Sequence, residues 1–149
     1  MSMPEGERDR MIDAVTRVAE RSLYAFAEAV PADLMPRTID GGWHVASVEF
    51  TGPFSGRMSM TVPTVLGRQI CSAFLGDEDV ADDTAVRDLV GEFANMTCGT
   101  WLTARHEAQC FDLMHPDVVD ADQAPSCDIA FVVNELPVML RLEIGQGRP

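Results

Sequence analysis

Apolar residues recur at helical spacing in two long stretches of the chain. The first stretch predicts a helix over residues 7–30, which Pro31 would end, after a short flexible start at residues 1–6. The second stretch predicts a helix over residues 81–104. A shorter amphipathic stretch between them predicts a helix that begins at Pro63, because proline is favoured at the first helical position.

Alternating apolar and polar positions predict strands in most of the remaining chain. Residues 43–50 and 55–62 are predicted to form the two arms of a hairpin, and residues 117–126 a polar linker. Three later segments are predicted to be strands: 109–114, 127–133 and 136–144. The order α-β-β-α-α-β-β-β predicts one α/β (α+β) domain over residues 1–149, in which a mainly antiparallel sheet packs against helices.

The helix predicted over residues 81–104 has two chemically different faces. Four residues lie at i, i+4, i+7 and i+11 and therefore form one narrow polar stripe: Asp88, Glu92, Asn95 and Gly99. The opposite face is apolar and is predicted to be buried, and it carries Leu89, Val90, Phe93, Ala94, Met96 and Trp101.

Two glycines, Gly91 and Gly99, flank the polar pair of this helix. A glycine inside a helix costs about 1 kcal/mol relative to alanine, so the two glycines need a physical reason. One reason is that another group must approach this face of the helix closely. The glycines therefore favour a contact site along the stripe.

Charge narrows the classes of partner. The chain has 24 acidic and 11 basic residues, for a net charge of −13, and it shows no basic face for phosphates. Nucleic acid is therefore a poor candidate partner. Five of the acids lie within residues 77–83, where they complement the positive N-terminal end of the following helix, and Asp82 or Asp83 is the predicted N-cap.

The distribution of apolar residues argues against a membrane partner. The first ten residues are polar where a signal peptide would be apolar, and no apolar run approaches 18 residues. The sequence therefore predicts a soluble, cytoplasmic protein.

Most motifs that carry chemistry are missing from the sequence. The four cysteines have no CxxC spacing and are predicted to be free thiols, and the three histidines are scattered, so no metal site is expected. Gly-x-Ser-x-Gly, Gly-x-x-x-x-Gly-Lys and Gly-x-Gly-x-x-Gly do not occur, so neither a serine nucleophile nor a nucleotide site has a motif. The polar stripe is left as the candidate site.

Glu92 and Asn95 lie one turn apart on the stripe, although an ordinary solvated helix face could also present them. The chain has two asparagines. Asn134 suits a turn, whereas Asn95 lies in the middle of a predicted helix, where asparagine is mildly unfavourable. The placement of Asn95 and the flanking glycines together favour a functional site.

The pattern Asp88-x-x-x-Glu92-x-x-Asn95, followed by Gly99 and Pro116, resembles the signature of the CheX/CheC/FliY family of chemotaxis phosphatases. The resemblance extends over residues 45–122, through the segments FTGPFSGRMSMTVP and FDLMHPDVV, and is looser at both ends. The spacing from Asn95 to Pro116 is one residue shorter than is usual in the family, and His115 stands where a smaller residue is common. The first predicted helix has no asparagine for a second Glu-x-x-Asn site, which favours a CheX-type protein.

The resemblance implies a phosphatase that removes the phosphoryl group from the phosphoaspartate of a CheY-like receiver domain, in chemotaxis or another two-component circuit. Asn95 would orient the attacking water, and Glu92 would pair with the active-site lysine of the receiver. Four residues would support the site: Asp88, Gly91, Gly99 and Pro116. The resemblance also implies a homodimer without a cofactor or metal of its own, since the Mg²⁺ would be carried by the receiver.

Two alternatives remain open at this stage. The protein could be an adaptor or sensor that binds a phosphorylated receiver without hydrolysing it. It could also be a flagellar-switch component like FliY, although such proteins carry an additional domain.

Overall fold

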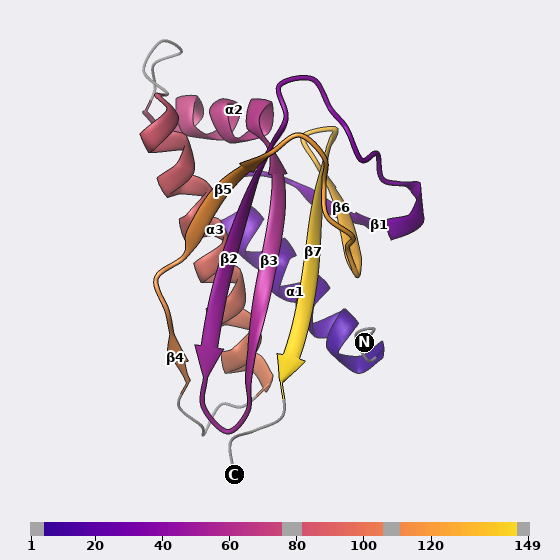
Figure 1. Ribbon diagram of the computed structural model, residues 1–149, viewed down its shortest axis with the longest axis vertical. Helices are drawn as coiled ribbons and strands as arrows, with labels where there is room; N and C mark the ends of the chain where they lie inside the picture. The colour runs from indigo at the N-terminus through magenta and orange to yellow at the C-terminus, as the bar shows by residue number, and fades with distance from the viewer. Residues whose placement is uncertain (1–4, 76–81, 106–110, 146–149) are drawn as a thin grey trace.

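The computed structural model of the protein describes residues 5–75, 82–105 and 111–145. Within these residues, two long helices cover one face of a seven-stranded antiparallel sheet, and a shorter helix lies at one end (Figure 1). The helices are α1 (Glu5–Ser22), α2 (Thr64–Leu75) and α3 (Asp83–Arg105), with a 3-10 turn η1 (Ala32–Leu34). The strands are β1 (Ala27–Val30), β2 (Trp43–Thr51), β3 (Ser55–Pro63), β4 (Asp112–Leu113), β5 (Asp117–Ala121), β6 (Ile129–Val133) and β7 (Leu136–Gly145). The predicted α/β (α+β) fold with a mainly antiparallel sheet is confirmed.

The main core forms where every second residue of the central strands points toward the helices. Its strand residues are Ala46, Val48, Phe50, Met58, Met60, Val62, Ile129, Phe131, Val133, Val138, Leu140 and Leu142. The strands order as β1-β6-β7-β3-β2-β4, and β5 also pairs with β2. Because β2 is bonded to β3 on one side, β4 and β5 occupy its other side and form the sheet edge beside α3.

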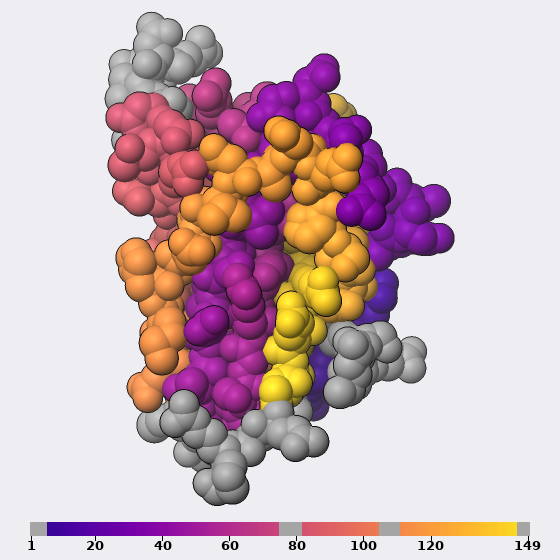
Figure 2. All heavy atoms as spheres, in the orientation of Figure 1, coloured from indigo at the N-terminus to yellow at the C-terminus, as the bar shows by residue number. Residues whose placement is uncertain are grey.

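None of the described helices covers the opposite face of the sheet, and β2, β3 and β7 reach the surface there (Figure 2). A second, smaller apolar cluster lies on this side, around Trp43, Ala124, Ala130 and Met139. The indole nitrogen of Trp43 donates a hydrogen bond to the carbonyl of Arg37 at 3.1 Å, which ties the segment after η1 to the sheet.

The first helix ends earlier than its periodicity predicts. We expected it to run to residue 30, but α1 stops at Ser22, and Tyr24 has a positive φ of 52°. Beyond it, Leu23, Ala25 and Ala27 are buried while Tyr24 and Phe26 are exposed, which is the two-residue period of a strand. Apolar residues there fit both periods, and pairing of β1 with β6 decides for the strand. At the other end, α1 already includes residues 5 and 6 of the expected flexible start.

The predicted polar linker at 117–126 is wrong in its first half, which forms strand β5. Its sequence is acidic and largely exposed, so the apolar alternation of a half-buried strand is missing. Pro63 also differs from prediction, because it ends β3 opposite Trp43, and α2 begins at Thr64. Of the strand predicted at 109–114, only Asp112–Leu113 is a strand, and residues 109 and 110 lie outside the described residues.

The hairpins follow the sequence closely. The hairpin of β2 and β3 is confirmed, with Trp43 paired to Pro63 at its open end. Between β6 and β7, Asn134 and Glu135 have φ values of 50° and 68°, as a tight two-residue turn with both central residues left-handed requires. None of the described helices has the length and apolar character needed to cross a membrane.

Candidate active site

Helix α3 is fixed at its start and along its inner face. The backbone N–H of Ala85 donates to the Oδ1 of Asp82 at 2.7 Å, so Asp82 is the N-cap that the acidic run predicted. Val90, Phe93, Ala94 and Trp101 of the predicted apolar face are buried, and Leu89 and Met96 are half-buried. The buried carboxylate of Glu7 on α1 accepts a hydrogen bond from the indole of Trp101 at 2.9 Å, which fixes the rotation of α3. The polar stripe is therefore held on the outer face.

The polar side chains of the stripe are not engaged in hydrogen bonds or ion pairs with the rest of the described molecule. Asp88 and Glu92 are exposed and Asn95 is half-buried. Side chains three positions apart on a helix have Cβ atoms about 5–6 Å from each other, so Glu92 and Asn95 can contact one ligand together. Within the described ranges, none of the three makes a side-chain hydrogen bond or ion pair with another residue. Their hydrogen-bonding groups are available to a partner.

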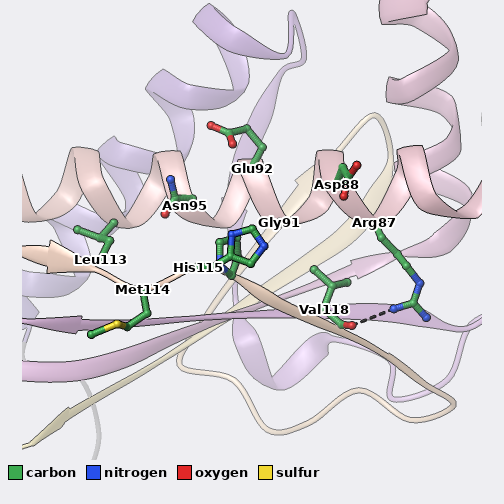
Figure 3. A pocket seen from close by; sticks show the side chains of 10 residues that line it. Arg87, Asp88, Gly91, Glu92, Asn95, Leu113, Met114, His115 and Val118 are labelled. Atoms are coloured by element: carbon green, nitrogen blue, oxygen red, sulfur yellow. Dashed lines mark hydrogen bonds between the residues drawn. The ribbon is translucent and has the colours of Figure 1, made fainter.

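A groove of about 800 Å³ runs along the stripe. One wall is α3, with Asp88, Glu92 and Asn95, and the other is the chain between β4 and β5 (Figure 3). The second wall presents Leu113, Met114, His115, Pro116 and Val118. In Figure 3, the carboxylate of Glu92 extends away from this second wall, while His115 lies beside Gly91 between the levels of Asn95 and Asp88.

The second wall owes its shape to a bulge in the edge strand. Phe50 pairs with Leu113, and Ser47 pairs with Asp117. The two residues between Phe50 and Ser47 on β2 are therefore opposite three residues, 114–116, on the edge strand. The extra residue interrupts the ladder at residues 114–116, where proline loses no ladder bond. The N–H of Met114 donates to the carbonyl of Glu49 at 2.8 Å and anchors the start of the bulge.

Gly91 lies directly under the bulge. A Cβ atom built on Gly91 would be 3.3 Å from a methyl carbon of Val118 and 3.4 Å from the ring of Pro116. The close approach predicted at this glycine is therefore made by the chain's own wall. Pro116, twenty-one positions after Asn95 in the sequence, belongs to the same groove because the missing Cβ lets it pack on the helix.

Gly99 lies in a different environment. The nearest atom to a Cβ built there would be a methyl carbon of Leu113 at 3.9 Å, which is an ordinary contact distance. A second hollow, of about 740 Å³, begins at Asn95 and passes Gly99 toward Arg17 and Ser22 of α1. Gly99 thus keeps this side of the stripe open.

A cluster of charged side chains closes one end of the groove. Arg87 donates from Nε to Asp83 at 2.9 Å, from Nη2 to Asp120 at 2.6 Å, and from Nη1 to the carbonyl of Val118 at 2.9 Å. The hydrogen bond from Arg87 lowers the pKa of the Asp83 carboxyl and raises the pKa of Arg87 itself. Beneath them, Nε2 of the buried His44 lies 3.2 Å from Oδ1 of Asp120.

The cysteines are poor candidates for a nucleophile. Burial on the inner side of α3 raises the pKa of the Cys98 thiol to about 12, so it stays protonated at neutral pH. Burial also raises the pKa of Cys71 and Cys127. Cys110 lies outside the described residues. In the part of the chain that the structure covers, no three His, Cys, Asp or Glu side chains gather as a metal site would require.

Comparison with known protein families identifies the family to which this fold belongs. The family model "Chemotaxis phosphatase CheX" matches residues 44–131, which include α3, the bulge and the groove between them. The chain belongs to the CheX family. No curated protein gives a significant match to it.

Solved structures of CheX proteins share the fold over nearly the whole chain. CheX from Vibrio vulnificus superposes with a TM-score of 0.73 at 18% identity, covering 97% of this chain and 100% of that one. CheX from Desulfovibrio desulfuricans gives 0.70 at 21% identity, covering 95% and 99%. The CheX–CheY–BeF₃–Mg²⁺ complex from Borrelia burgdorferi gives 0.64 at 16% identity, covering 93% and 97%.

The structure brings the six sequence-predicted site residues into two neighbouring hollows. Asp88, Glu92, Asn95, Gly91 and Pro116 line the groove, and Gly99 lines the second hollow beside Asn95. Arg87 and its contacts with β5 were not among the predicted site residues. The spacing of four from Asp83 is a signal that could have pointed to a helical ion pair, but nothing in the sequence places Asp120 nearby.

Proposed function

We propose that this protein hydrolyses the phosphoaspartate of a CheY-like receiver domain, with Asn95 orienting the water and Glu92 holding the receiver. The supporting observation is the Glu92/Asn95 pair, an exposed carboxylate and a half-buried amide along an open groove in a protein of the CheX family. Neither side chain makes a hydrogen bond or ion pair with another described residue. In the Borrelia burgdorferi complex, a CheX protein is bound to CheY with BeF₃ and Mg²⁺. BeF₃ stands in for the phosphoryl group of the receiver.

The reaction needs little from the protein beyond positioning. The water oxygen forms a bond to phosphorus as the bond between phosphorus and the aspartate oxygen breaks, and the products are the free carboxylate and inorganic phosphate. An amide can accept a hydrogen bond from the water and donate one to a phosphoryl oxygen, so Asn95 can hold the water in line. A hundredfold acceleration requires about 2.7 kcal/mol, which orientation can supply.

Glu92 is suited to a cation on the receiver. Its carboxylate is exposed, one turn from Asn95, and makes no ion pair with any other described residue. A lysine of the receiver that reached Glu92 would fix the receiver's orientation, so that its phosphoaspartate meets the water at Asn95. We propose that the metal ion belongs to the receiver, and that the CheX-type chain is a homodimer in solution.

The direct test is the variant Asn95→Ala, with phosphate release from a phosphorylated receiver as the measurement. We expect the stimulated rate to fall about a hundredfold or more, toward the receiver's own rate, because the water loses its orienting group. The fold should remain, since Asn95 makes no side-chain hydrogen bond within the described residues. A melting curve that matches the wild type provides the control, and an unchanged rate of phosphate release would refute the assignment.

A binding module without catalysis is the second candidate, because Glu92 and Asn95 could bind a receiver without speeding the hydrolysis of its phosphoaspartate. Wild-type protein that binds the BeF₃-treated receiver yet leaves the lifetime of the phosphoaspartate unchanged would select this alternative. A flagellar-switch role is distinguished by co-purification with motor proteins rather than with a free receiver.

A further inference from the structure

The position of the second wall is not set by the sheet. Strand β5 pairs with β2 on one side, and its other side faces α3, to which it makes no ladder of backbone hydrogen bonds. An edge strand that carries a bulge can twist or shift away from its neighbour more readily than a central strand. The distance between the two walls must therefore depend on side-chain contacts.

Arg87 provides these contacts from the helix side. Its guanidinium reaches the carbonyl of Val118 and the carboxylate of Asp120, both on β5, while its Nε is held by Asp83 at the start of α3. We call Arg87, Asp83, Asp120 and the Val118 carbonyl the clamp. Gly91, one turn farther along α3, has no side chain to displace Val118 and Pro116, which lie where a Cβ would meet them. Figure 3 shows the bond from Arg87 to Val118 at the end of the groove.

The buried His44 of β2 supports the clamp from the side of the sheet. Nε2 of His44 lies 3.2 Å from Oδ1 of Asp120 and 3.7 Å from Oδ1 of Asp83, so a buried ring on β2 lies against both carboxylates. Among the described residues, Nδ1 of His44 has no hydrogen-bond partner, so the Nε2 side carries the polar contacts of this ring. Asp120 is thus held from two directions.

We propose that Arg87 is a positioning residue that fixes β5 and the bulge against α3 and thereby sets the width of the groove that the receiver enters. The inference rests on the proposed function for the identity of the partner. Asn95 and Glu92 lie on α3 and keep their spacing without the clamp, so loosening the second wall should weaken receiver binding more than the chemical step. Lysine cannot replace arginine here, because a single ammonium cannot donate in three directions in one plane.

The first measurement needs no receiver. Hydrogen exchange of the peptide covering residues 113–121 should become about threefold or more faster in Arg87→Lys, because β5 opens more often once the clamp is lost. Arg141→Lys is the matched control. Arg141 is an exposed arginine on β7 that also contacts a hydroxyl, at 3.1 Å from Ser126, and a carboxylate, at 3.5 Å from Glu143. Exchange of residues 113–121 should be unchanged in the control.

The second measurement is titration with a BeF₃-treated receiver, together with steady-state phosphate release. We expect Arg87→Lys to raise Kd and KM about tenfold, while kcat stays within about twofold of the wild type. Asn95→Ala should show the reverse, with kcat lost and Kd retained. A residue that only stabilised the fold would change the amount of active protein and would not separate KM from kcat in this way.

Each outcome decides the inference. Unchanged exchange in Arg87→Lys refutes the clamp, and faster exchange with unchanged Kd refutes its role in the groove. If Arg87→Lys does not fold, Asp120→Ala is measured in its place, since it removes the side-chain contact of Arg87 with β5 but keeps the pair of Arg87 with Asp83. Unfolding of both variants would show that the contact is needed for the whole fold and would overturn the proposal. A wild type that binds no receiver refutes the proposed function, and the exchange result still decides whether Arg87 holds the wall.

Discussion

The two walls of the groove are built in opposite ways. The α3 wall is local, because Asp88, Glu92 and Asn95 take their mutual spacing from the helix and make no side-chain hydrogen bond or ion pair with other described residues. The β4–β5 wall is non-local, since its shape requires a bulge against β2, packing on Gly91 and the hydrogen bonds of Arg87. The first wall carries the proposed chemistry, and the second determines what can reach it.

The two walls should therefore respond differently to substitution. A substitution on the stripe should remove one chemical function and leave the fold intact. A substitution at the second wall should move several groove residues together and also affect stability.

Reversing the charge of Glu92 should have the largest effect on binding. In Glu92→Lys, a lysine would face the receiver's lysine. Loss of a close ion pair at an interface costs about 2–5 kcal/mol, so Kd should rise about thirtyfold or more. Titration with a BeF₃-treated receiver measures the change, and the melting temperature should stay close to that of the wild type.

The control for Glu92→Lys is Asp88→Lys, which makes the same charge change one turn away on the same exposed stripe. We expect it to weaken binding only about threefold, as general electrostatic attraction between the proteins would. Equal losses in the two variants would contradict a specific ion pair at Glu92.

The local wall could be predicted from the sequence, whereas the non-local wall could not, apart from Pro116, which the family resemblance supplied. The stripe follows from the helical period, and the buried opposite face is confirmed at Val90, Phe93 and Trp101. Strand β5 was missed because it is acidic and paired on one edge, so it lacks an apolar face that repeats every second residue. Its partner on β2 is seventy or more positions away, and no short-range pattern encodes that pairing.

The end of α1 illustrates the same limit. Leu23, Phe26 and Val30 fit a helical face, but Phe26 is 67% exposed, because the segment becomes the edge strand β1. The competing two-residue period at Leu23, Ala25 and Ala27 is short and rests partly on alanines, which give a weak apolar signal. Pairing with β6 determines the structure there.

A side chain at Gly91 should disturb the second wall and leave the stripe in place. In Gly91→Leu, the new atoms would enter space that Val118 and Pro116 already fill, and overpacking of this kind typically costs about 1–3 kcal/mol. We expect the free energy of unfolding, measured in urea, to fall by that amount and receiver binding to weaken as the wall moves.

The matched variant is Gly99→Ala on the same helix. Its Cβ would meet only an ordinary contact at 3.9 Å, and alanine favours the helix by about 1 kcal/mol over glycine, so the free energy of unfolding should rise. If both variants changed stability in the same direction, the two glycines would not differ as the structure indicates, and packing of Pro116 on Gly91 would not explain the wall.

The smallest expected effect is a pH dependence at the start of α3. The hydrogen bond from Arg87 lowers the pKa of Asp83 in the folded protein, whereas an aspartate in the unfolded chain has a pKa of about 3.9. The folded state therefore binds this proton less readily, and the stabilisation is complete above that pH and is lost as the pH falls through the lower, folded pKa. Because Asp83 is solvent-exposed, the effect should be small and screened by salt.

The measurement is the melting temperature of wild type and Asp83→Asn as a function of pH. The wild type should melt higher at pH 6, and the difference should narrow as the pH falls below about 4, where the unfolded aspartate becomes protonated. Asp88→Asn removes the same charge from a stripe residue that forms no ion pair within the described ranges, so it should lower the melting temperature less at pH 6. A difference for Asp83→Asn that persists unchanged into acid would mean that Asp83 contributes through its shape rather than through its negative charge beside Arg87. The clamp would then depend on Asp120 and Val118 alone among the described contacts of Arg87.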